Sequence, residues 1–519
     1  METKEKLQRM KTKTINYIKK NWFNILIFVI YAIITFIVAI FFHEKWRDEA
    51  QAWLIARDLN FLDILKQMSY EGHPPLWHLL LMPFAKLGFP YITESVLCWA
   101  ITCLSAWLIL TKSPFKKGTQ ILILLTAPML FLCPVVARSY CLIPLALTLI
   151  AIFYPRRKQK PVRYTLSILL LAYTHILMLG MVGILYLFFF LEEIFYTKKE
   201  KKDIKNLILC IIIAVVGLLA LAFMLFGSTE KNTELQLGSL FSIDTHRLQL
   251  LMNQFQYFIF GTISFSYGFK VFLTTMLIVL ILYQAKKNSQ NLVIALVSIV
   301  WQVFIYLCIY GVSQQKLNLM VLIFIFIAWV NQQEGKEQKN GEKKQLEVRV
   351  RYKETFLKAV TSGIMILLVL NVMQGITMMK EDIVGKYTNA KEAAQYINQN
   401  IEDNAIIISC MGPFSSALIP YTEGDIKFWN ASSEKFFTYM TWDKISNEEI
   451  GVSQIIENVK KNFKKGDILY LLNSNHIIKE DDEELKKLQQ ENVISEALYK
   501  SKEKSEIYEE VYELYKIML

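Results

Sequence analysis

The sequence has few cysteines that could form disulfides, and it has no visible internal repeat. Seven of its 519 residues are cysteines, none of them in a CxxC pair, and six lie in apolar runs. This distribution excludes a disulfide framework. Transporters usually show related halves, so the lack of a visible repeat does not favour a transporter. Charged residues reach only 20%, whereas hydrophobic residues reach 54% and the mean hydropathy is +0.31. Repeated runs of about twenty apolar residues therefore predict a polytopic α-helical membrane protein.

The formal net charge of +11 conceals a division along the chain. Residues 377–519 hold 17 Lys and 25 Asp or Glu, a net charge of −8, which leaves +19 for the preceding part. The positive charges lie in loops between apolar runs, so they indicate membrane topology and not a nucleic-acid partner. The basic N-terminus in front of the first apolar run predicts that this end of the chain is cytoplasmic.

The basic loops predict about eleven spans in a multi-pass protein of the cell membrane, with an extracytoplasmic C-terminus. The segment 161–196 is basic at both ends, so it should cross twice and turn near the outer surface at Tyr173, Thr174 and His175. The other spans are expected at 21–42, 92–110, 119–133, 139–153, 207–226, 258–283, 292–310, 317–330 and 356–376.

The loop 43–92, outside the first span, holds the densest set of ionisable residues in the membrane part. Such residues are costly at a membrane surface unless they face water, a metal ion or an anionic ligand. Its segment 74–86 is apolar but reaches only about 20 Å as a helix, against a hydrocarbon core of about 30 Å. We therefore expect this segment to lie along the outer interface. Asn60 with Asp63 predicts the start of another short helix.

Residues 380–519 have the pattern of a separate small α/β domain outside the membrane, after a membrane domain of residues 1–379. Helices are expected at 390–398, 453–463 and 481–490, strands at 405–409, 426–429 and 467–472, and a closing strand or hairpin around 507–515. The domain contains no phosphate loop, metal-ligand spacing or catalytic triad. We expect it to pack over the outer loops without supplying a catalytic base.

Four short motifs outside the membrane resemble the GT-C glycosyltransferases, in particular the protein O-mannosyltransferases and the aminoarabinose transferases of bacterial lipid A (glycosyltransferase family 39-like). The motifs are Asp48-Glu49, Gly72-His73-Pro74-Pro75-Leu76-Trp77, Ala137-Arg138-Ser139-Tyr140 and Tyr173-Thr174-His175. The resemblance covers about the first 200 residues. The sequence departs from the family at one position. The family usually has a basic residue followed by an aromatic residue at the outer start of a late span, whereas this sequence has Lys316-Leu317-Asn318.

The resemblance implies an enzyme of the bacterial cell envelope. Such enzymes move a sugar from a polyprenyl-phosphate donor to an extracytoplasmic hydroxyl on a lipid, glycan or protein. The chemistry needs a carboxylate that takes the acceptor proton. It also needs cations, or a divalent metal ion such as Mg²⁺ or Mn²⁺, that hold the leaving phosphate.

Each candidate residue has a catalytic and an ordinary interpretation. Asp48 is interpreted as the general base, or as an acid favoured at a helix start. Glu49 is placed in the catalytic set but points about 100° away from Asp48 on a helix, so it would support a metal ion or the loop. The phosphate-binding set is His73, Arg138, Tyr140 and Lys316; further site members are Glu71, His78 and His175, and Glu49 with Glu71 are the metal ligands.

In the ordinary interpretation, Glu71 is an acid in a solvated loop and His73 forms hydrogen bonds with water. Arg138 would then be an arginine at a helix end whose charged group reaches the membrane surface. Two other classes stay open at this point: a transporter or flippase for lipid-linked saccharides, and a non-catalytic component of an envelope assembly. Only an enzyme must lose turnover when Asp48 loses its charge.

Overall fold

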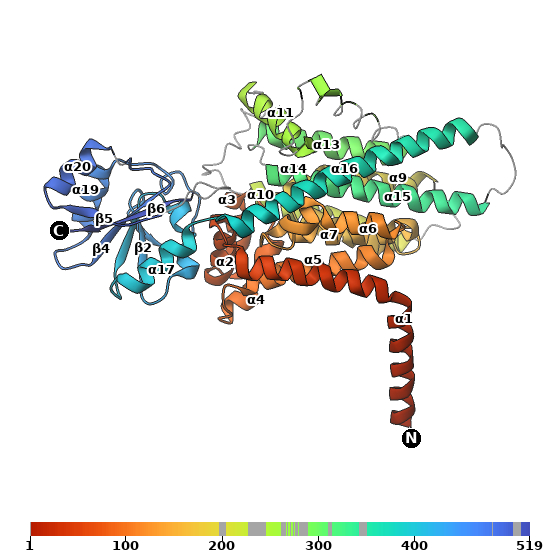
Figure 1. Ribbon diagram of the computed structural model, residues 1–519, viewed down its shortest axis with the longest axis horizontal. Helices are drawn as coiled ribbons and strands as arrows, with labels where there is room; N and C mark the ends of the chain where they lie inside the picture. Colours follow the sequence, from red (N-terminus) through yellow and green to blue (C-terminus); the bar gives the residue numbers. More distant parts are fainter. Residues whose placement is uncertain are drawn as a thin grey trace.

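A helical bundle and an α/β domain lie end to end in the computed structural model (Figure 1). The structure describes residues 2–196, 204–226, 245–260, scattered positions between 266 and 279, 289–309, 314–341, 350–479, 481–501 and 510–519. The N-terminus and the α/β domain lie at opposite ends of the molecule. This arrangement agrees with the predicted membrane domain followed by a separate α/β domain.

The bundle consists of long apolar helices with polar breaks between them. The longer helices are α1 (Glu2–Ile37), α5 (Thr93–Lys112), α7 (Leu142–Phe153), α8 (Pro161–Ala172), α9 (Leu179–Leu191), α10 (Ile204–Phe226), α11 (Thr245–Phe260), α13 (Ser289–Cys308), α15 (Met320–Gly341) and α16 (Val350–Val384). Shorter pieces are α6 (Lys117–Leu125), the π-helical turns Val38–Phe42 and Pro128–Leu132, and α14 (Gln314–Asn318).

Seven helical segments among the described residues are long and apolar enough to cross a membrane, so the chain is a multi-pass membrane protein. They are Asn16–Phe42, Thr93–Lys112, Ser139–Arg156, Ile176–Phe195, Ile204–Phe226, Ser289–Cys308 and Lys316–Gln333. The predicted span 258–283 lies largely outside the described residues, and the number eleven stays a prediction.

Two predicted spans differ from simple crossings. The segment 161–196 folds into α8 and α9, which pack on each other across a turn at Tyr173 and Thr174, as predicted. The predicted span 119–133 is not one continuous helix, because α6 ends at Leu125 and Thr126 has an extended backbone. Pro128 then starts a new helical turn, since proline lacks the N–H needed to continue the preceding one.

Three short helices cover the end of the bundle that faces the α/β domain (Figure 1). They are α2 (Arg47–Asp58), α3 (Phe61–Glu71) and α4 (Leu76–Lys86). The predicted cap is present: the Asp63 backbone N–H donates to Asn60 Oδ1 over 3.0 Å. Gly72 ends α3 at φ +67°, a conformation that glycine adopts without strain. The 11 residues of α4 rise only about 16 Å, too little to cross the hydrocarbon core of about 30 Å.

The α/β domain has a six-stranded mixed sheet with strand order β3-β2-β1-β4-β6-β5. Its strands are β1 (Ile406–Ser409), β2 (Lys427–Asn430), β3 (Lys435–Phe437), β4 (Leu469–Ser474), β5 (Ile494–Lys500) and β6 (Tyr512–Ile517). Neighbouring residues of β1 point to opposite faces, so Ile407 packs with α17 (Ala390–Asn400), and Ile408 packs with α19 (Val452–Asn462) and α20 (Glu483–Gln490). The predicted elements are confirmed, but strands β3 and β5 were not predicted.

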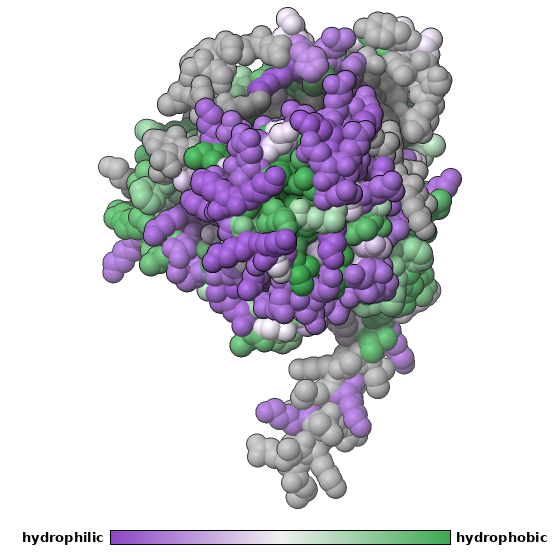
Figure 2. Space-filling model, turned by 90° about the vertical axis from the view of Figure 1, so that its left-hand side faces the viewer, coloured by the Kyte–Doolittle hydropathy of each residue, from purple (hydrophilic) through white to green (hydrophobic). Residues whose placement is uncertain are grey.

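Hydrogen bonds attach the domain to the loop 43–92, which is the predicted outer loop. The predicted boundary at residue 380 lies within the last turns of α16, which continues to Val384. The Lys45 backbone N–H donates to the Tyr421 hydroxyl over 3.0 Å, and the Arg47 backbone N–H donates to Glu510 over 3.3 Å. The domain therefore packs on the outer loop, as expected. Its face away from the bundle is mainly hydrophilic (Figure 2), as a surface in water should be.

Cysteine labelling is expected to find the α/β domain outside the cell. Glu423 is exposed, so a Glu423→Cys variant should react with a membrane-impermeant maleimide in intact cells. Cys410 and the six other cysteines are buried and should contribute little background. A Gln159→Cys variant, exposed in a predicted cytoplasmic loop, serves as the matched control and should react only after the membrane is opened. The reverse pattern would contradict the predicted orientation.

Candidate active site

A pocket of about 240 Å³ lies where α2, α3, α4 and the segment around Arg138 meet the α/β domain. Two acids, two histidines and an arginine predicted from the sequence line it: Asp48, Glu71, His73, His78 and Arg138. The other lining residues are Gln51, Ala52, Tyr70, Pro74, Trp77, Ser139 and Trp442. The fold thus brings together candidates that are separated by up to 90 positions in the chain.

Asp48 and Arg138 form the central ion pair of this pocket. Arg138 Nη1 donates to Asp48 Oδ2, and Asp48 lies in the first turn of α2, where a negative charge is favourable. The Asp48 side chain keeps 24% of its surface exposed and the Arg138 side chain 11%. Asp48 is therefore held in place by the arginine while it stays accessible from the pocket.

His73 lies beside Arg138 in the pocket lining. Its Nε2 lies 3.3 Å from Arg138 Nη2, and its ring centroid lies 5.1 Å from that of His175. The His175 ring in turn lies 5.5 Å from the Tyr140 ring, and the Arg138 guanidinium carbon lies 5.4 Å from the centre of Tyr140. The predicted residues His73, Arg138, Tyr140 and His175 therefore form one continuous group.

Burial keeps His73 neutral. Burial lowers its pKa well below the ordinary value, and the neighbouring His175 and the charges of Arg138 and Lys316 lower it further. Lys316 is therefore close enough to the site to act on it electrostatically. Burial and the charge of Arg138 also lower the pKa of His78 to about 3. The positive charge in the pocket lining comes from Arg138, Lys316 acts on it from outside the lining, and the histidines act as neutral hydrogen-bonding groups.

Glu71 ends α3 and points into the pocket among amide groups. Gln51 Nε2 donates to Glu71 Oε1 over 2.8 Å, and Gln67 Nε2 donates to the same oxygen over 3.1 Å. Burial raises the pKa of Glu71 to about 7, although hydrogen bonds from Gln51, Gln67 and Trp442 oppose the rise. Glu71 is thus a carboxyl group that titrates near neutral pH.

Glu71→Gln is expected to flatten the pH dependence of stability. The folded protein keeps a proton on Glu71 up to about pH 7, whereas the ordinary pKa is 4.5. The stability from this group is therefore fully present below pH 4.5 and is lost as the pH rises through 7. Over this pH range the free energy of unfolding of Glu71→Gln, measured by thermal unfolding, should fall by roughly 1–3 kcal/mol less than that of the wild type.

The exposed acid Asp63 on the same helix provides the control for that measurement, because Asp63→Asn should keep the wild-type pH profile. Parallel profiles for wild type and Glu71→Gln between pH 4.5 and 8 would show that Glu71 ionises normally.

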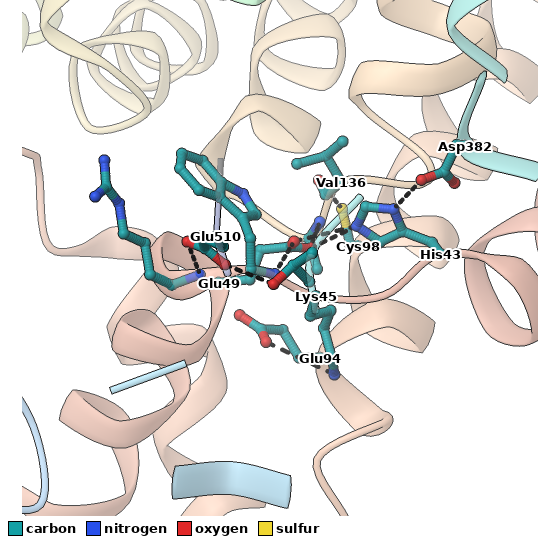
Figure 3. Close-up of polar contacts among 12 residues, drawn as sticks. His43, Lys45, Glu49, Glu94, Cys98, Val136, Asp382 and Glu510 are labelled. Atoms are coloured by element: carbon teal, nitrogen blue, oxygen red, sulfur yellow. Dashed lines mark hydrogen bonds and ion pairs between the residues drawn. The ribbon is translucent and has the colours of Figure 1, made fainter. Parts of the chain in front are cut away.

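Glu49 belongs to a second, fully buried network beside the pocket (Figure 3). Its Oε1 accepts from the Ala137 backbone N–H over 2.6 Å, and its Oε2 lies 3.1 Å from His43 Nε2. His43 Nδ1 lies 3.0 Å from Asp382 Oδ1 on α16. Burial alone would lower the pKa of His43, but the charges of Asp382 and Glu49 raise it to about 10. A protonated histidine thus joins two carboxylates.

This network positions the two central residues of the pocket. Glu49 follows Asp48 directly, and Ala137 precedes Arg138 directly, so the bond between Glu49 and Ala137 fixes the two backbones against each other. The Trp46 backbone N–H also donates to Glu49 over 3.2 Å. The structure therefore places Glu49 behind the pocket wall, where it supports Asp48 and Arg138.

The predicted metal ligands do not come together. Glu49 bonds His43 and backbone N–H groups, whereas Glu71 bonds the amides of Gln51 and Gln67. Within the described part of the chain, no group of three or more His, Cys, Asp or Glu side chains is arranged to hold a metal ion. The two acids therefore do not fit a shared ion, and a divalent-metal requirement stays a prediction.

Several pocket residues were not among the candidates predicted from the sequence, and Gln51, Trp77 and Trp442 are the largest polar or aromatic ones that bear on the site. Gln51 lies one turn after Asp48 on the predicted helix, and this spacing could have indicated it. Trp77 closes the motif that begins at Gly72 but was given no role in the site. Trp442 comes from the α/β domain, almost 400 positions after Asp48, and no local pattern marks it.

The fold and the pocket define a multi-pass membrane protein with an acid–arginine site at the junction with an α/β domain. No protein-family model and no curated protein matches the sequence. Among solved structures, the chain is similar to ArnT from Cupriavidus metallidurans in a crystal structure bound to undecaprenyl phosphate. The match has 9% identity and a TM-score of 0.47, and it covers 96% of this chain and 98% of that chain. The functional proposal therefore depends on the site residues themselves.

Proposed function

We propose that this protein is a membrane glycosyltransferase that moves a sugar from a polyprenyl-phosphate donor to an extracytoplasmic hydroxyl acceptor. The observation that carries the proposal is the pocket in which Asp48 is paired with Arg138, with His73 beside them. The carboxylate can take the proton of an acceptor hydroxyl, and the neighbouring cation can stabilise the leaving phosphate.

The reaction follows from these groups. The acceptor oxygen attacks the anomeric carbon of the donor sugar, a new C–O bond forms, and the bond from that carbon to the phosphate oxygen breaks. The phosphate leaves with the bonding electrons, and Asp48 takes the proton of the acceptor hydroxyl. The guanidinium of Arg138 has five N–H donors, so it can bind the phosphate while it still contacts Asp48.

The positions of the groups suit a lipid-linked donor. Arg138 immediately precedes the helical segment Ser139–Arg156, so a phosphate bound there keeps its lipid tail beside the bundle. Lys316 begins another apolar segment, Lys316–Gln333, and adds a second positive charge. Charges at helix ends of this kind can hold a phosphate at the membrane surface without being buried in lipid.

Arg138→Ala is expected to raise the donor KM by roughly 10- to 150-fold, because a charge-assisted hydrogen bond contributes about 1.5–3 kcal/mol. The assay uses purified protein in lipid nanodiscs, a panel of undecaprenyl-phosphate hexoses and pentoses, and membranes of a host strain that lacks the protein as acceptor. Arg57→Ala is the control, since Arg57 lies on α2 but pairs with Asp58 at the surface. An unchanged donor KM in Arg138→Ala would remove Arg138 from the phosphate site.

A transporter or flippase for lipid-linked saccharides is the alternative. The same assay distinguishes it, because a flippase moves the intact donor between leaflets and forms no new glycosidic bond. Mass spectrometry of envelope glycans with and without the protein then identifies the sugar and the acceptor.

A further inference from the structure

One wall of the pocket is supplied by the α/β domain. Its residues 440–442 follow strand β3 and lie against α2 and α3. The Met440 backbone N–H donates to Gln51 Oε1 over 3.0 Å, and its carbonyl oxygen accepts from Gln51 Nε2 over 2.6 Å and from Gln67 Nε2 over 3.2 Å. Gln51 thus pairs with this segment through both atoms of its amide, and all three residues are buried.

The backbone of this segment is held in an unusual conformation at Trp442. Its φ of +57° lies in the left-handed region, which side chains other than glycine adopt at a cost of about 1 kcal/mol or more. The next residue stabilises the turn, because Asp443 accepts from the Ser446 backbone N–H over 2.9 Å and from the Ser446 hydroxyl over 2.8 Å. This turn directs the Trp442 side chain into the pocket lining.

The surroundings of Trp442 combine aromatic surface with polar groups. Tyr70 and Trp77 also line the pocket, together with the carboxyl groups of Asp48 and Glu71. The Trp442 side chain is also among the groups that oppose the rise of the Glu71 pKa, so it acts on the same carboxyl group. Sugar rings have apolar C–H faces and hydroxyl edges, so they fit a site that pairs aromatic surfaces with convergent polar groups.

We propose that Trp442 is an acceptor-binding residue that packs against a carbohydrate ring of the acceptor. This inference rests on the proposed function and specifies it, because it names the acceptor class as a glycan or glycolipid. We assign Trp442 to the acceptor because the two walls of the pocket come from different parts of the chain. Arg138, at the start of a membrane-spanning segment, holds the carrier phosphate, whereas Trp442 comes from the domain beyond the end of the bundle. A ring packed on Trp442 places its hydroxyl near Asp48, which lines the same pocket.

The test separates binding of the acceptor from binding of the donor. Trp442→Ala and Trp442→Phe are assayed with the same nanodisc system, and the amount of host membrane glycan that gives half-maximal transfer is measured. Undecaprenyl phosphate affinity is measured separately by native mass spectrometry. Phe436→Ala is the matched control, because Phe436 is an aromatic residue of the same domain that is 55% exposed on β3.

For Trp442→Ala we expect the half-saturating amount of acceptor to rise roughly 10- to 30-fold, as for a central aromatic contact. Undecaprenyl phosphate affinity should stay within about twofold, and Trp442→Phe should recover part of the loss. An unchanged acceptor requirement would overturn the proposal, and so would an equal loss of undecaprenyl phosphate affinity. Asp48→Asn in the same assay tests the proposed function independently, because that substitution leaves the Trp442 wall intact.

Discussion

Replacing Asp48 by asparagine is expected to lower kcat for sugar transfer by at least about 100-fold, within the range of about 10²–10⁴ for a general base. Asparagine has the same shape and keeps an oxygen that can accept from Arg138, but it cannot take the proton of an acceptor hydroxyl. Donor affinity should therefore stay nearly unchanged. Steady-state transfer from undecaprenyl-phosphate sugars, combined with binding of undecaprenyl phosphate, measures the two effects separately.

The opposite end of α2 offers a matched substitution for this experiment. Asp58→Asn changes an acid that pairs with Arg57 at the surface, and it should leave both kcat and donor affinity as in the wild type. Near-normal transfer by Asp48→Asn would place the base elsewhere and would remove the main support for this pocket as the active site.

Glu49→Ala is expected to destabilise the protein by about 3–5 kcal/mol, the usual result of removing one partner of a buried charge pair. The substitution leaves the protonated His43 with Asp382 alone, and it leaves the backbone N–H groups of Trp46 and Ala137 without their carboxylate acceptor. Thermal unfolding in detergent should show a much lower midpoint than in the wild type.

Glu49→Gln should lose less stability, since its amide oxygen can still accept from one of the backbone N–H groups. This comparison also decides between two roles for Glu49. If Glu49→Ala kept the wild-type unfolding midpoint but lost turnover, Glu49 would act in the chemistry itself. We expect stability and turnover to fall together, because the residue positions Asp48 and Arg138.

The short helix α4 was predictable, because Pro74 precedes the apolar run and Gly88 follows it. Its rise of about 16 Å is well below a hydrocarbon core of about 30 Å, and its position along the outer interface stays a prediction. The α/β domain was predictable from alternating apolar runs, with two exceptions. Strand β5 has only one buried residue, Ile494, followed by partly buried and exposed ones. Strand β3 has only three residues, so neither pattern stands out from a polar loop.

The site was only partly predictable. The motifs that resemble the GT-C glycosyltransferases indicated Asp48, His73 and Arg138, and the fold brings these three into one pocket. The sequence did not indicate that Glu49 faces away from the pocket toward His43. Helix geometry gives the angle between two adjacent side chains, but it does not give the tertiary contacts of either one.

The sequence by itself determined the membrane class, and it indicated which short motifs hold the candidate acid and arginine, since hydrophobic length and residue type are local properties. Only the tertiary structure decided which carboxylate faces the pocket and which one is buried against His43. It alone also brought Trp442 beside residues almost 400 positions earlier. Contacts between distant segments depend on how whole elements pack, and no local pattern of residues records that packing.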